Sequence, residues 1–326
     1  MRISVQTNKN VIFFETLLSF INTDKDFHPL GMKVIEEFKD IKKIKAFEEF
    51  QKDVKEKKTP SHPWQYIFLS INLSDDLTPK SLSPADGFGP NSEKSYMENI
   101  NTIVNKKHPE SNFEKRYSEK ILPEYEILVQ DIQNIFNKQN PGDILEEFWG
   151  KKLKANLVFI PDFLRVEGGS GVSRGDEFYS ITGTVKTENG IEFKSSHMIS
   201  NLLHEYSHSF FKNYLYKSED LFKKNEESCH TLFERIKEDR ESEVFKNYGK
   251  PTIYFEETFI RAVQIMLSKR FFEKAMNKDM QSKALEQLRK RKEEGFMFIE
   301  KFYKELENNQ KPMDSYIKVL ENIVNN

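Results

Sequence analysis

The chain has 326 residues, a length that suits one large domain or two of medium size. Its 50 basic and 52 acidic side chains leave a net charge of -2, which excludes the strongly basic surface typical of proteins that bind nucleic acid or anionic membranes. Only 37% of the residues are hydrophobic, but the 28 phenylalanines each bury a large area and can supply a core.

Cysteine and hydropathy patterns narrow the class of protein further. Cys229 is the sole cysteine in the sequence, so an intramolecular disulfide and a cysteine-based metal site are excluded. No run of about 18 apolar residues occurs, which predicts that no segment spans a membrane. The first residues lack the order of regions seen in a signal peptide, so the sequence as given predicts a cytoplasmic protein, or a secreted one if a leader was removed.

The first 150 residues carry mostly helical patterns. Apolar side chains recur every three or four positions in three stretches, 11–22, 31–55 and 112–138. An aromatic-rich piece at 62–74, a proline- and glycine-rich loop at 74–92, a helix at 93–105 and a short helix at 143–149 complete the prediction. We therefore expect a mainly helical N-terminal region.

Residues 153–193 have the character of strands. A strand is predicted at 153–160 with Pro161 ending it, and a second strand at 177–185. The glycine-rich segment 166–174 between them is predicted to be a loop, and Asn189-Gly190 is a hairpin turn signal. These patterns predict a small mixed or antiparallel sheet.

Helical patterns fill the rest of the chain. We predict helices at about 196–214, 217–247, 252–276, 278–308 and 312–324. The expected fold class is α+β, mainly helical, with the small sheet beside the helix at 196–214. The chain then divides into a helical region, 1–150, and a catalytic region, 151–326, or forms one continuous domain.

One motif carries chemistry. Residues 201–210 read NLLHEYSHSF, in which His204 and His208 are separated by one helical turn and therefore face the same side of a helix. Two imidazoles placed in this way can bind one metal ion. Glu205 projects beside that ion, where it can act as general base toward the water that a zinc ion makes acidic. The motif predicts a site for one Zn²⁺.

A third metal ligand must come from elsewhere, because Phe211 and Tyr214 stand where a histidine-extended motif needs glycine and histidine. The candidates are Glu257, Glu226 and Glu256. Burial favours Glu257, since residues 251–266 have the apolar face that a helix packed against the histidine helix requires, whereas the segment around Glu226 is crowded with charge.

The order of these residues resembles a known group of enzymes. HEYSH followed by Glu257, Arg261 and Ala262 in a Glu-x-x-x-Arg-Ala segment is similar to the gluzincin branch of the zincin metallopeptidases, and to a bacterial group of that clan filed as a domain of unknown function. The specific residues lie within about 197–266. The resemblance implies a zincin-like fold, with zinc ligands His204, His208 and Glu257 and general base Glu205.

The resemblance leaves two roles to assign. Arg261 lies one turn beyond Glu257 and is expected to orient that carboxylate from the second layer of the site. Zincins often stabilise the oxyanion with a histidine or tyrosine, for which Tyr254 and His230 are the candidates here. The expected function is zinc-dependent hydrolysis of a peptide or protein substrate. The alternatives are a zinc-binding module without turnover, or a zinc hydrolase that acts on another substrate.

Overall fold

The computed structural model describes residues 2–21, 26–43, 45–55, 112–138, 140–152, 156–174, 176–212, 223, 226–238, 244–245, 248–276, 279–309 and 311–324. The segments predicted at 62–74, 74–92 and 93–105 lie outside these residues. The chain forms two compact units. We call Ile3–Lys138 with Ala155–Met198 the sheet unit, and Met1–Arg2 with Gln139–Lys154 and Ile199–Asn326 the helical unit.

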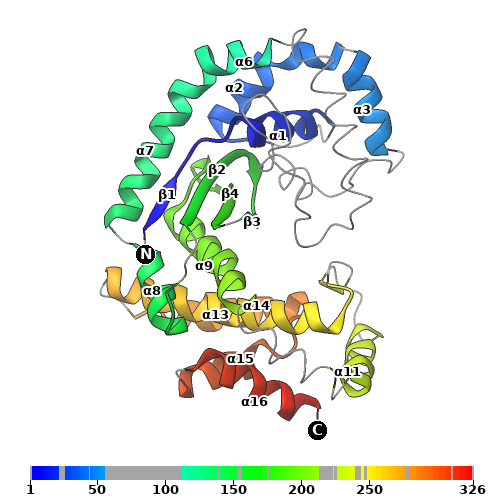
Figure 1. Cartoon of the computed structure of the whole chain (residues 1–326), viewed down its shortest axis with the longest axis vertical. Coiled ribbons are helices and arrows are strands. Elements are labelled where there is room, and N and C mark those ends of the chain that lie inside the picture. The colour runs from blue at the N-terminus through cyan, green and yellow to red at the C-terminus, as the bar shows by residue number, and fades with distance from the viewer. Residues whose placement is uncertain are drawn as a thin grey trace. The chain divides into compact units, whose positions relative to one another are not determined.

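The sheet unit contains one mixed five-stranded sheet, which together with the many helices confirms the α+β class. Its strands are β1 (Ile3–Val5), β2 (Asn156–Val166), β3 (Gly169–Arg174), β4 (Glu177–Thr187) and β5 (Gly190–Glu192). The order is β1-β2-β4-β3, and β5 pairs with β4. β1 and β4 run parallel to β2, whereas β3 and β5 run antiparallel to β4 (Figure 1).

Two details of the predicted sheet were wrong. Pro161 does not end its strand, because proline removes only one hydrogen-bond donor from the ladder and β2 continues to Val166. The pairing register of β2 with β4 then shifts between Asp162 and Val166. The glycine-rich segment is not a loop, since Gly169–Arg174 pairs with β4 as β3. The tight turn before β3 places Glu167 and Gly168 in left-handed conformations, with φ of 64° and 78°.

Helices of the sheet unit cover both faces of β2. They are α1 (Lys9–Ile21), α2 (Pro29–Glu37), η1 (Lys39–Lys43), α3 (Lys45–Lys55), α6 (Phe113–Arg116), η2 (Tyr117–Ile121) and α7 (Leu122–Lys138). Val11 of α1 is buried with Val158 and Ile160 on one face, and Phe136 of α7 packs edge-on against Phe159 on the other. The helix predicted over 31–55 is divided into α2, η1 and α3.

A side chain closes the outer edge of β1. Gln133 of α7 accepts a hydrogen bond from the Val5 amide at 2.8 Å and donates one to the Ile3 carbonyl at 3.1 Å. These are the main-chain groups that a neighbouring strand would otherwise pair. The edge strand is therefore satisfied within its own unit.

Three charged side chains are buried together beside the irregular part of β2. The Arg165 guanidinium donates to Glu15 of α1 at 2.8 Å and lies 3.5 Å from the Asp162 carboxylate. Asp162 is fully buried and also accepts a hydrogen bond from the Leu164 amide. Burial, followed by the negative charge of Glu15, raises the pKa of Asp162 well above its ordinary value.

The helical unit is built from α8 (Pro141–Trp149), α11 (Glu226–Glu238), α13 (Pro251–Met276), α14 (Gln281–Glu294), α15 (Ile299–Asn308), α16 (Pro312–Val324) and most of α9 (Ser195–Lys212). The first turn of α9 belongs to the sheet unit. The single helix predicted at 278–308 is divided into α14 and α15 at Gly295, whose φ is 122°. Of the helix predicted at 217–247, the structure describes mainly α11.

Aromatic side chains form the core of the helical unit. Trp149 of α8 stacks on Phe210 of α9, with ring centroids 5.9 Å apart, and also contacts Phe259 of α13. Phe211 of α9 and Tyr316 of α16 both pack on Phe259. These contacts fix α9 against α13. Among the described residues, no helix is both long enough and apolar enough to cross a membrane.

Candidate metal centre

Helix α9 places two histidines on one of its faces. His204 and His208 have ring centroids 5.0 Å apart, and their Nε2 atoms lie 3.4 Å from each other. The helix is held in place by buried neighbours of the histidines, which are Leu202, Leu203, Tyr206, Phe210 and Phe211. Because one face of α9 is fixed by this packing, both imidazoles are directed to the same point.

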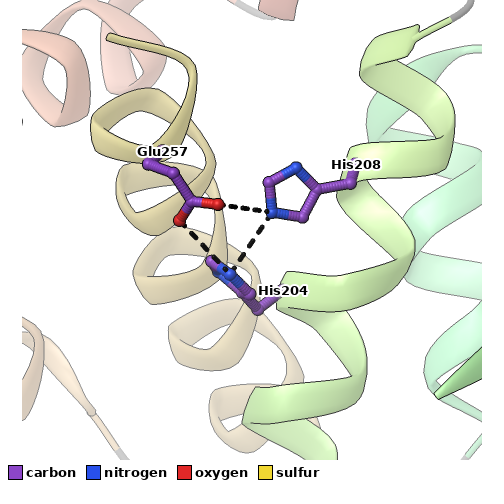
Figure 2. A group of neighbouring side chains, drawn as sticks. All are labelled: His204, His208 and Glu257. Atoms are coloured by element: carbon purple, nitrogen blue, oxygen red, sulfur yellow. Dashed lines mark hydrogen bonds and ion pairs between the residues drawn. The ribbon is translucent and has the colours of Figure 1, made fainter. Parts of the chain in front are cut away.

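Helix α13 brings one carboxylate to that point. Glu257 places Oε1 3.2 Å from Nε2 of His208 and Oε2 3.7 Å from Nε2 of His204 (Figure 2). One ligand atom from each of the three residues lies within 4.8 Å of the other two. This group could hold a metal ion, and it is the one such group among the residues that the structure describes.

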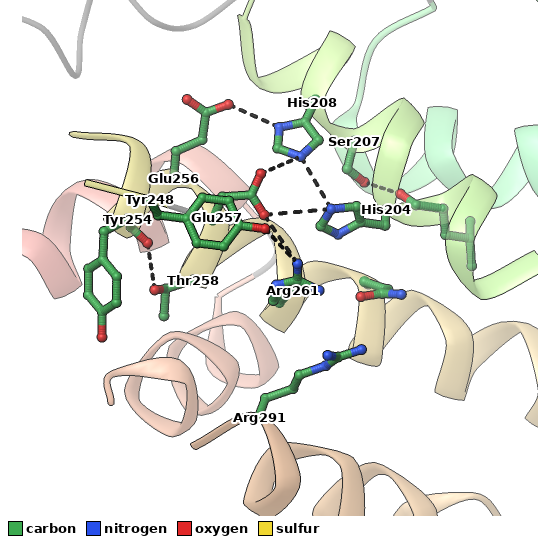
Figure 3. A network of polar contacts seen from close by, with 12 residues as sticks. His204, Ser207, His208, Tyr248, Tyr254, Glu256, Glu257, Thr258, Arg261 and Arg291 are labelled. Atoms are coloured by element: carbon green, nitrogen blue, oxygen red, sulfur yellow. Dashed lines mark hydrogen bonds and ion pairs between the residues drawn. The ribbon is translucent and has the colours of Figure 1, made fainter. Parts of the chain in front are cut away.

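The other two candidate ligands lie elsewhere. Glu226 is an exposed residue at the start of α11 and does not belong to the group. Glu256 contacts His208, but its Oε1 lies 3.0 Å from Nδ1, the ring nitrogen on the other side from the three ligand atoms (Figure 3). Neither glutamate is therefore placed to complete the set.

Charges around the cluster favour a cation at its centre. Burial lowers the pKa of His208, but the nearby Glu257 charge, the hydrogen bonds that Glu256 and Glu257 accept, and the charge of Glu205 outweigh it and raise that pKa to about 10. Burial opposes ionisation of Glu257, yet the two histidines and Arg261 bring its pKa down to about 2. The same negative electrostatic potential that stabilises a proton on His208 would stabilise a bound metal ion.

His204 is the more buried of the two imidazoles. Burial, and then the positive charge of Arg261, hold its pKa well below the usual range. Its ring is therefore neutral and keeps a lone pair on one nitrogen, which is the form that binds metals. The Oε2 atom of Glu257 is buried without a hydrogen-bond partner in the described part of the chain, so it too is open to a cation.

Arg261 and Tyr248 form a second layer around Glu257. The Nη2 atom of Arg261 lies 3.6 Å from Oε2 of Glu257 and donates to the Tyr248 hydroxyl at 3.0 Å. The guanidinium also lies over the Phe296 ring, 4.7 Å from its centroid. Arg261 thus lies where the sequence predicted it, beside the carboxylate that it was expected to orient.

Tyr248 is a residue that the sequence did not reveal. Its hydroxyl lies beside Glu257 and Arg261 in Figure 3, and the charges of Glu257 and Glu205 both act on it. Burial, followed by the charge of Glu257, raises the pKa of Tyr248, so its hydroxyl keeps a proton to donate. Tyr248 lies between the helices predicted at 217–247 and 252–276, and it therefore gave no signal beyond being aromatic.

The two residues predicted to stabilise an oxyanion are placed differently. The Tyr254 hydroxyl donates to the Gly295 carbonyl at 2.8 Å, accepts from the Met297 amide and points away from the histidines (Figure 3). It shares α13 with Glu257, but it occupies the packed side of that helix and is fully buried. His230 is exposed on α11 and is not part of the cluster. The Tyr254 hydroxyl is therefore not directed at the cluster, and the role expected for His230 stays a prediction.

Comparison with known proteins yields one family. Residues 65–324 match the family described as "Domain of unknown function (DUF4932)". The matched segment includes α9 and α13 and hence every residue of the group that could hold a metal ion. No curated protein and no solved structure matches the chain.

Proposed function

This chain belongs to the family described as "Domain of unknown function (DUF4932)", and we propose that it is a zinc-dependent peptidase. The observation that carries the proposal is the convergence of His204, His208 and Glu257 on one point, with ligand atoms within 4.8 Å of one another. Glu205 directly follows the first histidine on the same helix. Two imidazoles, one carboxylate and an adjacent carboxylate outside the ligand set are the groups that a hydrolytic zinc site requires.

The donor atoms favour a transition metal such as zinc over calcium or magnesium. Two nitrogens and one oxygen suit a borderline-soft cation, whereas calcium and magnesium prefer sites made of oxygens alone. Three protein ligands leave one position for solvent or substrate, as in catalytic rather than structural zinc sites. A zinc ion held by His204, His208 and Glu257 would supply Lewis acidity and make water acidic near neutral pH.

Glu205 is the residue to which we assign the proton transfers. It is half-buried on α9, and its charge acts on His208, Tyr248 and Arg261, so it lies near the centre of the site. Its carboxylate would accept a proton from the attacking water and later deliver that proton to the leaving amine. The positive charge of Arg261 partly offsets the negative charges of Glu205 and Glu257 in the site.

Tyr248 is the hydroxyl that we assign to the developing oxyanion. Arg261 donates to its oxygen at 3.0 Å, which leaves the phenolic hydrogen free to turn toward a substrate. A donor positioned before the reaction stabilises charge that appears only in the transition state. This role replaces those expected for Tyr254 and His230.

The test compares the wild-type chain with Glu205→Gln. Zinc content is measured by elemental analysis after dialysis, and cleavage is followed on casein, an unfolded protein that does not demand a particular sequence. We expect one zinc ion in both proteins, and cleavage by the wild type alone. The variant should lose activity by a factor of about 100 or more, as expected for removal of a general base.

Other outcomes would contradict the proposal in different ways. If the wild-type chain holds no zinc under these conditions, the proposed metal site is wrong. Equal inactivity of wild type and variant on casein and on a broad peptide library, with zinc bound, would favour a zinc-binding module. Equal and measurable cleavage by both proteins would show that Glu205 is not the base.

A further inference from the structure

We propose that Glu256 is a positioning residue, which fixes the ring of His208 for metal binding by accepting a hydrogen bond from its Nδ1 atom. The proposal rests on the metal site of the proposed function and adds a residue to it. Glu256 was considered above only as a ligand. Its contact with the far side of the imidazole gives it a different task.

The two nitrogens of His208 face different carboxylates. Nδ1 lies 3.0 Å from Oε1 of Glu256, whereas Nε2 lies 3.2 Å from Oε1 of Glu257 (Figure 3). When a metal binds, the His208 ring must release one of its two protons, and the neutral imidazole that remains has one N–H donor and one lone pair. When Glu256 accepts the hydrogen on Nδ1, the lone pair is placed on Nε2, which is the atom directed at the metal position.

The two histidines need different amounts of support. Only 8% of the His204 side chain is exposed, and its Nδ1 atom has no hydrogen-bond partner among the described residues. Packing rather than a hydrogen bond to Nδ1 therefore holds this ring. The side chain of His208 is 17% exposed, so packing covers less of its ring. A hydrogen bond to Glu256 supplies the restriction that packing supplies for His204.

One helix delivers both carboxylates. Glu256 and Glu257 are consecutive residues of α13, so their side chains leave the helix in different directions and reach the two edges of the same ring. Any change that turned α13 about its axis would disturb both contacts together. The pair therefore couples the orientation of His208 to the helix that supplies the third ligand.

The experiment measures zinc affinity by competition with a chromogenic chelator, and so does not depend on activity. The proteins are wild type, Glu256→Ala, Glu256→Gln and the control Glu286→Gln, which alters an exposed glutamate of α14. Loss of an outer partner of a metal-binding histidine typically lowers affinity by about 10- to 100-fold. We expect that loss for Glu256→Ala and none for the control.

The glutamine variant separates the hydrogen bond from the charge. Its side-chain oxygen can still accept from Nδ1, so Glu256→Gln should recover most of the affinity lost by Glu256→Ala. Circular dichroism of the metal-free proteins checks that each variant folds. Wild-type affinity in Glu256→Ala would overturn the inference, as would equal losses in the alanine and glutamine variants. A wild-type chain that binds no zinc would instead overturn the proposed function.

Discussion

Two tyrosines near the start of α13 have hydroxyls in very different surroundings. Tyr248 meets Arg261 beside the metal cluster, whereas Tyr254 bridges the Gly295 carbonyl and the Met297 amide inside the helical unit. Removing either hydroxyl deletes one atom but should have opposite consequences. The pair therefore tests the assignment of the oxyanion donor.

We predict that Tyr248→Phe lowers kcat for peptide cleavage by a factor of about 100 to 1,000, the range measured for loss of one oxyanion donor. Zinc affinity should stay within a factor of about three, because the hydroxyl is not a ligand. Steady-state kinetics and the chelator titration measure both quantities. A lower zinc affinity with unchanged kcat would assign Tyr248 to holding the metal site.

The matched variant Tyr254→Phe should behave in the reverse manner. It removes a buried hydroxyl that donates to the Gly295 carbonyl and accepts from the Met297 amide, which costs about 1 to 3 kcal/mol of stability. Thermal unfolding should show a lower midpoint, while kcat at a temperature well below that midpoint stays unchanged. A loss of kcat in the fully folded variant would instead show that the Tyr254 hydroxyl takes part in catalysis.

Individual residues of the site differ in how well the sequence predicts them. The spacing of His204 and His208 fixes their common face directly, because helical geometry is local. Choosing Glu257 over Glu226 required an argument about which helix is buried, and the structure brings Glu257 to the histidines. Tyr248 has no periodic context, and its place depends on how the chain approaches α13, which local rules do not specify.

At the scale of elements, the site depends on how α9 and α13 are held together. Besides the aromatic core, a polar contact links the helices: Gln264 donates to both the carbonyl and the hydroxyl of Ser200, each at 3.1 Å. The Ser268 hydroxyl lies 3.2 Å from that of Ser200. Ser200 is one turn before His204, so this contact fixes the position of α9 along α13.

We predict that Gln264→Ala lowers both stability and zinc affinity, although Gln264 contacts no ligand. Deleting a buried hydrogen-bonding side chain costs about 1 to 3 kcal/mol, and each kcal/mol corresponds to roughly 2 to 4 °C in the unfolding midpoint. Differential scanning calorimetry of the metal-free protein and chelator competition check the two effects. An unchanged zinc affinity in the folded variant would show that the aromatic contacts alone fix the helices.

Strands were harder to predict than helices for a physical reason. A helix is specified by local sequence, and the helix predicted at 252–276 agrees with α13 (Pro251–Met276) to within one residue. The segment Gly169–Arg174 contains little that favours a strand, and it becomes one because β4 offers a free edge. β1 is only three residues long, and its pairing with β2 spans most of the sheet unit's sequence, so no local pattern could reveal it.

At the scale of the whole molecule, the buried charges of the sheet unit link stability to pH. Asp162 is surrounded by Glu15, Arg165 and Tyr125, and burial followed by the charge of Glu15 raises its pKa well above the ordinary value of 3.8. Between those two pKa values the folded chain holds a proton that the unfolded chain releases. Stability contributed by this group is therefore present at low pH and lost as pH rises through the folded-state pKa.

We predict that the free energy of unfolding of the sheet unit falls as the pH rises above the ordinary aspartate pKa of 3.8, with a slope of at most about 1.4 kcal/mol per pH unit from this residue. Asp162→Asn keeps the shape without the titrating proton and should remove most of that slope. Urea unfolding of both proteins, followed by amide exchange in β2 and β4, provides the comparison. Equal slopes would show that Asp162 does not titrate in this range.

The amide of Gln133 has a consequence beyond its own unit. By occupying the Val5 N–H and the Ile3 carbonyl, it denies an incoming polypeptide the docking points that cross-β growth would use. Replacing Gln133 with an aliphatic residue would leave these two main-chain groups of β1 available to pair with another molecule. A single glutamine therefore helps to keep neighbouring copies of the chain from joining through β1 in a crowded solution.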